Sequence, residues 1–252
     1  MSDIHDTVFP GDFPGREDKI KYFKEISSTM DVARELAQTG CPHSTVVIAD
    51  RQVKGRGRLK RTWVSEKGGL YFTLVLRPQL SPLESYKVNF LASLVLAKTL
   101  RQKYSINAGV KWPNDILVGG KKISGILSEM ETQTDRIDYI NLGMGINVNN
   151  DPSGVEPKAT SVKKILNRNV SRKDLLTDFL NEFEARLCTV ATDDVIFQWK
   201  QHTVTLNQKV RIVTHHEVSE GIAIDVDQNG ALLLAQSDGL VKTILYGDCF
   251  LV

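Results

Sequence analysis

The chain has 252 residues, of which 41% are hydrophobic, so it is long enough for one large domain or for a large domain and a small one. Its formal net charge is only +2, which argues against a general nucleic-acid binder because such proteins carry a strongly basic surface. No apolar run approaches the roughly 18 residues of a membrane span, and the N-terminus lacks the basic and apolar regions of a secretion signal.

The three cysteines, Cys41, Cys188 and Cys249, lie far apart and follow neither a metal-ligand spacing nor a disulfide pattern. Such cysteines fit a reducing compartment. We therefore expect a soluble cytoplasmic protein that does not contact a membrane.

The N-terminal part of the chain predicts an irregular arm, a strand and a capped helix. Prolines and glycines among acidic residues are typical of a flexible arm, which we place at residues 1–19. An alternating pattern predicts a strand over residues 20–26. Ser28 and Thr29 then offer an N-cap for a helix. A carboxylate or a ureido group can bind at such a helix N-terminus, but the two hydroxyls can equally be a plain cap.

A basic run follows at residues 50–63, between two β-rich stretches at Thr45–Ala49 and Leu70–Leu76. Its six basic side chains lie between Arg51 and Arg61, and no acidic residue lies among them. Because these charges repel one another, we expect a mobile loop that an anion such as phosphate neutralises, and arginine pairs bidentately with phosphate oxygens. The alternative is a solvated basic loop or a nucleic-acid patch.

The middle of the chain predicts a long helix and a tight hairpin. Apolar residues cover a broad face of residues 82–104, which indicates a helix packed against a sheet. The glycine pair at 119–120 lies between two apolar runs and predicts the hairpin turn. Asn114 and Asp115 should then face Lys122 across adjacent strands. A structural ion pair is the alternative to a reactive site there.

An apolar stretch at residues 139–148 contains Gly143 and Gly145, and glycine inside a strand marks either close approach by a ligand or another backbone, or a bulge. A loop rich in Pro, Gly and Asp leads to a short helix opened by residues 159–161. A Ser-x-x-Asp cap predicts a longer helix over residues 171–188.

From about residue 205 the pattern changes to short β-like runs separated by turns. The runs are residues 209–214, 218–226, 231–236 and 240–246, with hairpin turns at Asn229-Gly230 and Asp238-Gly239. This tail holds three basic and six acidic residues. We expect a small antiparallel barrel that forms a separate domain.

Four motifs in this order and spacing resemble those of the biotin protein ligases, and Lys-Trp-Pro-Asn-Asp is the most specific of them. They are Gly-Arg-Gly-Arg at 55–58, Lys-Trp-Pro-Asn-Asp at 111–115, Lys-Ile-Ser-Gly-Ile-Leu at 122–127 and Gly-Met-Gly-Ile-Asn at 143–147. The resemblance covers residues 21–252. It implies an α/β (α+β) fold whose catalytic domain, residues 20–204, has a central mixed β-sheet flanked by helices, as in class II synthetase-like biotin/lipoate ligases. It also implies a C-terminal SH3-like β-barrel at residues 205–252.

The resemblance further implies a reaction and a set of site residues. The chain would bind biotin and Mg-ATP, form biotinyl-5'-AMP, and transfer biotin to one lysine of a biotin carboxyl carrier protein of a biotin-dependent carboxylase. Catalysis would fall to Lys122, Arg58 and Asp115. Biotin would contact Ser28, Thr29, Gln52, Arg56, Gly57, Arg58, Lys122 and Gly125. The nucleotide would contact Arg56, Arg58, Arg61, Trp63, Asn114, Asp115 and Asn147. We expect the phosphate oxygens of ATP to supply most of the ligands of Mg²⁺.

Two departures from the family pattern qualify this expectation. Met30 stands where other members often have Asn or Gln, so we assign no polar role to it. Members that are also repressors carry a winged-helix domain before the catalytic part, and the irregular residues 1–19 cannot hold one. We therefore expect a ligase that binds no DNA, as a monomer or a homodimer.

Other functions stay open at this point. A lipoate or octanoate ligase or transferase of the same superfamily shares the fold and a Lys-Ile-Ser-Gly element. A nucleic-acid-binding module would use the basic run alone. A catalytically silent biotin-binding adaptor is disfavoured because the cations that would face phosphates are all present.

Overall fold

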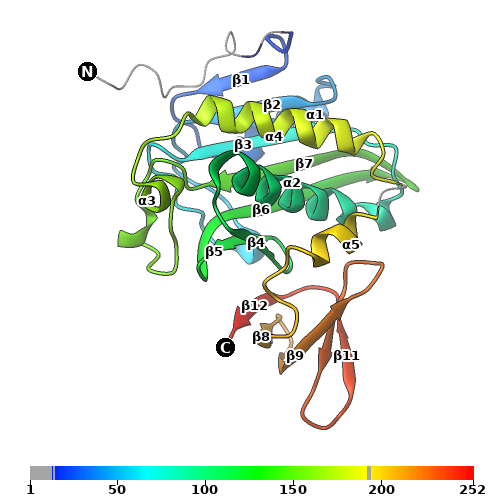
Figure 1. Cartoon of the computed structure of the whole chain (residues 1–252). Helices are drawn as coiled ribbons and strands as arrows, with labels where there is room; N and C mark the ends of the chain where they lie inside the picture. Colours follow the sequence, from blue (N-terminus) through cyan, green and yellow to red (C-terminus); the bar gives the residue numbers. More distant parts are fainter. Residues whose placement is uncertain (1–12, 14, 192–193) are drawn as a thin grey trace.

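The computed structural model describes residue 13, residues 15–191 and residues 194–252, so most of the expected N-terminal arm lies outside the described residues. The described chain forms a seven-stranded sheet with helices on both faces and a five-stranded antiparallel sheet at its C-terminal end (Figure 1). This arrangement confirms the predicted fold class.

The large sheet has the strand order β1-β2-β3-β7-β6-β5-β4. Its strands are β1 (Ile20–Phe23), β2 (Thr45–Ala49), β3 (Leu70–Leu76), β4 (Ala108–Lys111), β5 (Asp115–Val118), β6 (Lys121–Gln133) and β7 (Arg136–Ile146). Only β1 and β2 run parallel, and every other neighbouring pair is antiparallel, so the sheet is mixed. The strand predicted over residues 20–26 stops at Phe23, and Ile26 keeps only an isolated bridge to Gln52.

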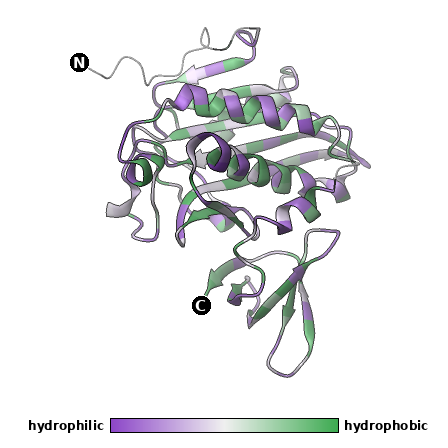
Figure 2. Ribbon diagram, in the orientation of Figure 1, coloured by the Kyte–Doolittle hydropathy of each residue, from purple (hydrophilic) through white to green (hydrophobic). Residues whose placement is uncertain are grey.

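Side chains on the strands alternate between two faces, as a pleated sheet requires. On β2, Val46 and Ile48 join the main hydrophobic core, whereas Val47 packs with Ala33 and Ala37 of α1 (Thr29–Gln38) on the opposite face. The main core lies under α2 (Tyr86–Tyr104) and α4 (Arg172–Leu187), which lie side by side in Figure 1. Figure 2 shows hydrophobic residues concentrated in the central strands and in α2.

Local capping and turn signals account for most element boundaries. Ser28 caps α1, and Ser171 Oγ accepts a hydrogen bond from Asp174 N at 3.1 Å at the start of α4. Ser161 caps the short α3 (Val162–Leu166), as expected. The helix predicted over residues 82–104 begins as a separate 3₁₀ turn, Pro82–Glu84, and α2 follows it. The short α5 (Val195–Lys200), capped by Asp194, was not predicted.

The glycine pair at 119–120 makes the predicted turn between β5 and β6. Gly119 has φ 55° and Gly120 has φ 75°, and two successive left-handed residues are the signature of a type I′ hairpin turn. This turn sets the register in which Asp115 pairs with Gly125 and Leu117 pairs with Lys122.

The C-terminal sheet has the order β11-β10-β9-β8-β12 and is antiparallel throughout. Its strands are β8 (Lys209–Val213), β9 (Val218–Val226), β10 (Leu232–Ala235), β11 (Val241–Ile244) and β12 (Asp248–Leu251). Four of them match the predicted runs. The fifth, β12, was missed, because four residues at the chain end carry no clear alternation. The domain boundary at residue 205 stays a prediction.

The turn between β9 and β10 fastens this sheet to the rest of the protein. The buried Trp112 indole donates to Gly230 O at 3.0 Å, and Tyr86 donates its hydroxyl to Gln228 O at 2.6 Å. Inner residues of the small sheet, such as Ile212 and Leu234, belong to the same hydrophobic cluster as the main core. None of the helices in the described part of the chain is long and apolar enough to cross a membrane.

We predict that Trp112→Phe lowers the free energy of unfolding by about 1–3 kcal/mol, because it leaves the carbonyl of Gly230 buried without its donor. Urea denaturation measures the change. Tyr246→Phe is the control: its ring is 45% exposed, and we expect a change within about 0.5 kcal/mol. Equal stability of Trp112→Phe and the parent protein would contradict the prediction.

Candidate active site

A cavity of about 510 Å³ opens on the face of the large sheet that carries α1, within the range of about 300–1,000 Å³ typical of small-molecule sites. Its walls come from the N-terminus of α1, the basic run, the β5–β6 hairpin, β7 and β12. All the residues that the sequence predicts for catalysis and binding line it: Ser28, Thr29, Gln52, Arg56, Gly57, Arg58, Arg61, Trp63, Asn114, Asp115, Lys122, Gly125 and Asn147.

The floor of the cavity is bare strand backbone. Gly125 of β6 pairs with Gly145 of β7, and Gly143 lies two residues along β7 on the same face. A Cβ at Gly145 would overlap with the Trp63 indole, and a Cβ at Gly143 would lie 2.5 Å from the sulfur of Met30. The glycines therefore allow Trp63 and Met30 to lie directly on the sheet.

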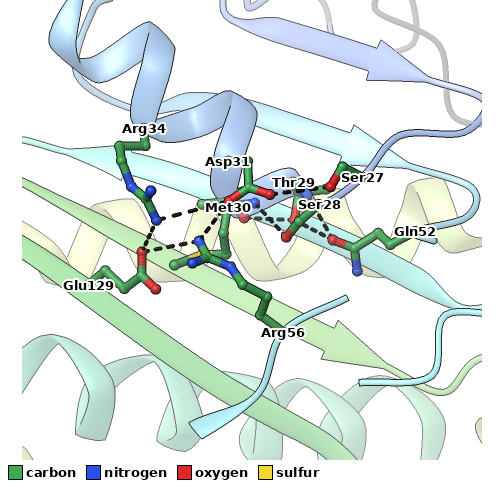
Figure 3. Close-up of polar contacts among 10 residues, drawn as sticks. Ser27, Ser28, Thr29, Met30, Asp31, Arg34, Gln52, Arg56 and Glu129 are labelled. Carbon is green, nitrogen blue, oxygen red and sulfur yellow. Dashed lines mark hydrogen bonds and ion pairs between the residues drawn. The ribbon is translucent and has the colours of Figure 1, made fainter. Parts of the chain in front are cut away.

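One end of the cavity gathers hydroxyl and amide groups, which we call the polar end (Figure 3). Gln52 Oε1 accepts from Thr29 N at 2.8 Å and from Thr29 Oγ1 at 3.1 Å. Gln52 Nε2 donates to Ser65 Oγ at 2.9 Å. Thr73 Oγ1 donates to Thr29 Oγ1 at 2.8 Å. Ser28 caps α1 and also lines the cavity, so the cap is confirmed and the binding of a ligand by Ser28 stays a prediction.

The other end gathers charged groups around one carboxylate, and we call it the cationic end. Lys122 Nζ lies 2.6 Å from Asp115 Oδ1, as the hairpin predicted, and Lys111 Nζ lies 3.6 Å from Asp115 Oδ2. The Lys122 ammonium also lies 5.3 Å from the centre of the Trp63 ring, within range of a cation–π contact. Two ammonium groups therefore share the single carboxylate of Asp115, which leaves this group of three with a net charge of +1.

Arg58 enters the cationic end from the basic run. Its Nη1 donates to Asn114 Oδ1 and to Gly247 O, each at 3.2 Å. Burial lowers the pKa of the Arg58 guanidinium, and the nearby carboxylates of Asp248 and Asp115 oppose that shift. Arginine stays protonated across the range in which proteins are folded, so Arg58 is a partly buried positive charge here.

The basic run folds back on itself as a small hairpin. Gly57 N donates to Arg61 O at 2.8 Å, and Trp63 N donates to Gly55 O at 2.9 Å. At its tip, Leu59 has φ 52° and Lys60 has φ 59°. A left-handed conformation costs a non-glycine residue roughly 1–2 kcal/mol, so the tip is strained.

Carboxylates from elsewhere in the chain pair with the arginines of the run. Arg51 pairs with Glu25 at 2.7 Å, Arg56 pairs with Asp31 and Glu129 at 3.2 Å each, and Arg61 pairs with Asp248. These carboxylates lie outside the run, so the composition of the run alone does not predict them. That an anion orders a mobile loop stays a prediction.

Several cavity residues were missed by sequence reasoning. Lys111 stands inside the Lys-Trp-Pro-Asn-Asp motif, and its register partner on β5 is Asp115, so that motif held the signal. Asp248 could be placed only with β12. Asn147, which was predicted, is buried: its N donates to Ile123 O at 2.9 Å and its Oδ1 accepts from Asn150. Among the described residues, no group of three or more His, Cys, Asp or Glu side chains could hold a metal ion.

Two family models match this sequence. The model of the biotin/lipoate A/B protein ligase family matches residues 22–147, and the model of the biotin protein ligase C terminal domain matches residues 205–252. The second match spans β8 to β12.

Named relatives and a solved structure agree with these models. The bifunctional ligase/repressor BirA of Bacillus subtilis (strain 168) is 33% identical over 229 residues, covering 88% of this chain and 70% of that protein. The biotin--[acetyl-CoA-carboxylase] ligase of Paracoccus denitrificans is 34% identical over 217 residues, covering 82% and 90%. The structure of a biotin protein ligase from Aquifex aeolicus in complex with biotin and ATP matches with a TM-score of 0.79 and 28% identity, covering 93% of this chain and 98% of that one.

We predict that Gly145→Ala expels the Trp63 indole from the cavity floor, because the new methyl group occupies the same space. Acrylamide quenching of tryptophan fluorescence should rise, and the change reports on Trp63 because Trp112 and Trp199 are fully buried. Gly154→Ala is the matched control, since a Cβ there meets open space. Unchanged quenching in Gly145→Ala would contradict the close approach of the indole to β7.

Proposed function

The chain belongs to the biotin/lipoate A/B protein ligase family, and from this premise we propose that it is a biotin protein ligase acting on a carrier protein of a biotin-dependent carboxylase. The observation that carries the proposal is the pairing of the two ends of one cavity: Lys122, Arg58 and Asp115 meet at the cationic end, and the hydroxyls and amide of the polar end lie across a glycine floor. The Aquifex aeolicus protein, which matches over nearly its whole length, binds biotin and ATP.

In the first half-reaction, an oxygen of the biotin carboxylate attacks the α-phosphorus of ATP, the bond to the bridging oxygen breaks, and pyrophosphate leaves. A carboxylate approaching a phosphate meets charge repulsion, so positive groups must stand where negative charge grows. We assign Lys122 to the space between the biotin carboxylate and the α-phosphate, with Arg58 beside it. Lys111 stays paired with Asp115 when Lys122 turns to the substrates, so Asp115 keeps a counter-charge.

In the second half-reaction, the neutral amine of the carrier lysine attacks the carbonyl carbon of biotinyl-5'-AMP, and AMP leaves as an amide forms. The amine must lose a proton, because a lysine in solution is an ammonium group. We assign Asp115 to accept or orient that proton, since it lies at the reacting end of the cavity. Arg61, Asn114 and Asn147 line the part of the cavity that we assign to the nucleotide.

The intermediate is a mixed anhydride that water would hydrolyse, so it must be covered. Trp63 and the hairpin of the basic run are suited to this, because the indole lies on the floor and the Arg58 side chain reaches Gly247 beside β12. Arg61 pairs with Asp248 in the same place. The C-terminal sheet thus helps to close the cationic end.

Mg²⁺ enters this proposal with ATP. The described residues offer no cluster of ligands for a resident ion, and the carboxylates nearest the cationic end, Asp115 and Asp248, are already paired with basic side chains. We therefore place the ion on the phosphates of ATP and assign no step of this chain's residues to it.

The superfamily rival, a lipoate or octanoate ligase or transferase, receives no support from the Paracoccus denitrificans relative, which is named as a biotin ligase. A cytoplasmic location, a lack of DNA binding and a monomeric or homodimeric state stay predictions from the sequence.

The test is incubation of the protein with biotin, Mg-ATP and an isolated carrier domain, followed by the intact mass of the carrier. We expect the carrier to gain one biotinyl group. A carrier that gains lipoate and not biotin in a parallel incubation would favour the rival, and no gain of either would refute the proposed activity.

For single residues, we predict that Lys122→Ala and Arg58→Ala each lower biotin-dependent ATP–pyrophosphate exchange about 10²- to 10³-fold, the range seen when one group that stabilises growing negative charge is removed. Lys121→Ala is the control, because this exposed neighbour on β6 does not line the cavity. Wild-type exchange in either variant would remove that residue from the first half-reaction.

A further inference from the structure

Arg56 points away from the cationic end. Its Nη2 lies 3.2 Å from Asp31 Oδ1 and 3.2 Å from Glu129 Oε2, and Arg34 Nη2 lies 2.9 Å from the same Glu129 oxygen. Figure 3 shows the guanidinium group of Arg56 between Asp31 and Glu129, with Arg34 reaching the pair from α1. The four side chains are 32–41% exposed and carry two positive and two negative charges, so the cluster is neutral.

This cluster lies beyond the polar end of the cavity. Glu129 stands four residues from Gly125 on β6, which is about 13 Å along a strand from the floor beneath Lys122. Asp31 lies in the first turn of α1, two residues after Thr29 of the polar end. Arg56 is therefore held near the polar end, away from the site that we assign to the phosphates.

The backbone at Arg56 belongs to the hairpin of the basic run. Arg56 forms an isolated bridge with Thr62, and Lys54 N donates to Ser27 O at 2.9 Å just before it. Ion pairs that fix the side chain of Arg56 therefore also fix the hairpin of the basic run, which forms one wall of the cavity. The Nε of Arg56 is buried and has no hydrogen-bond partner among the described residues, so it is free to donate to an acceptor in the cavity.

We propose that Asp31 and Glu129 are positioning residues that latch Arg56, and through it the basic run, over bound biotin. This inference rests on the proposed function and adds to it: the basic run is divided, with Arg58 and Arg61 serving the nucleotide and Arg56 serving retention of biotin. Arg34 supports the latch by pairing with Glu129. Half-exposed ion pairs are individually weak, so such a latch can open to admit biotin and close behind it.

The first test compares Asp31→Asn, Glu129→Gln and the double variant with Glu131→Gln. Glu131 lies two residues further along β6, is exposed and undergoes the same charge change. We expect the dissociation rate of biotin and the KM for biotin to rise about fivefold in each single variant and further in the double variant. The KM for ATP and kcat should stay near wild-type values, which a merely structural defect would not produce.

The second test needs no ligand. Trypsin cleaves after the lysines and arginines of the basic run, so limited digestion reports how firmly the run is held. We expect the double variant to be cut there several-fold faster than wild type, and Glu131→Gln to be cut at the wild-type rate.

The latch is overturned if the variants release biotin and resist trypsin as wild type does, or if the KM for ATP rises by the same factor as the KM for biotin. A wild-type protein that binds no biotin in calorimetry would instead refute the proposed function. The digestion comparison would then still decide whether Asp31 and Glu129 hold the run.

Discussion

The site depends on one carboxylate that keeps several positive side chains close together. Lys111, Lys122 and Arg58 would repel one another if they shared a cavity wall without a counter-charge. Asp115 pairs with both lysines, and Arg58 bonds to the adjacent Asn114. Lys122 and Arg58 can each exchange a protein oxygen for a phosphate or carboxylate oxygen of the substrates, while Lys111 stays beside Asp115, so the positive charge is assembled before the substrates arrive and little has to move.

The architecture supplies the other requirement, an open sheet face. The helices α2 and α4 cover one face of the large sheet, and α1 covers only part of the other. Beside α1 lies a strip of glycines, Gly125, Gly143 and Gly145, on whose backbone Trp63 of the basic run and Met30 of α1 lie directly. The strands contribute no side chains to this strip, which leaves room for an extended ligand. One end of such a ligand would contact the polar end of the cavity and the other would contact the cationic end.

The sequence predicts much of this site because its signals are local. A Gly-Gly turn sets the register between Asp115 and Lys122, serine caps place Ser28 and Thr29, and paired glycines indicate close approach. The partners of Arg56 and Arg61 could not be predicted in the same way. Glu129 and Asp248 are far from them in sequence, and they come close only through the strand order β3-β7-β6 and the placement of β12, which no periodicity specifies. The four-residue β12 carries too short a pattern to identify.

That last strand has a practical consequence for work with the protein. Residues 248–251 line the cavity, and Val252 follows them directly, with its N bonded to Lys209 O at 3.0 Å. An affinity tag, a fluorescent protein or a surface tether that is fused after Val252 begins at the rim of the cavity. Such an appendage would compete with a docking macromolecule for access, so kinetic work on this protein is best done with the opposite end modified.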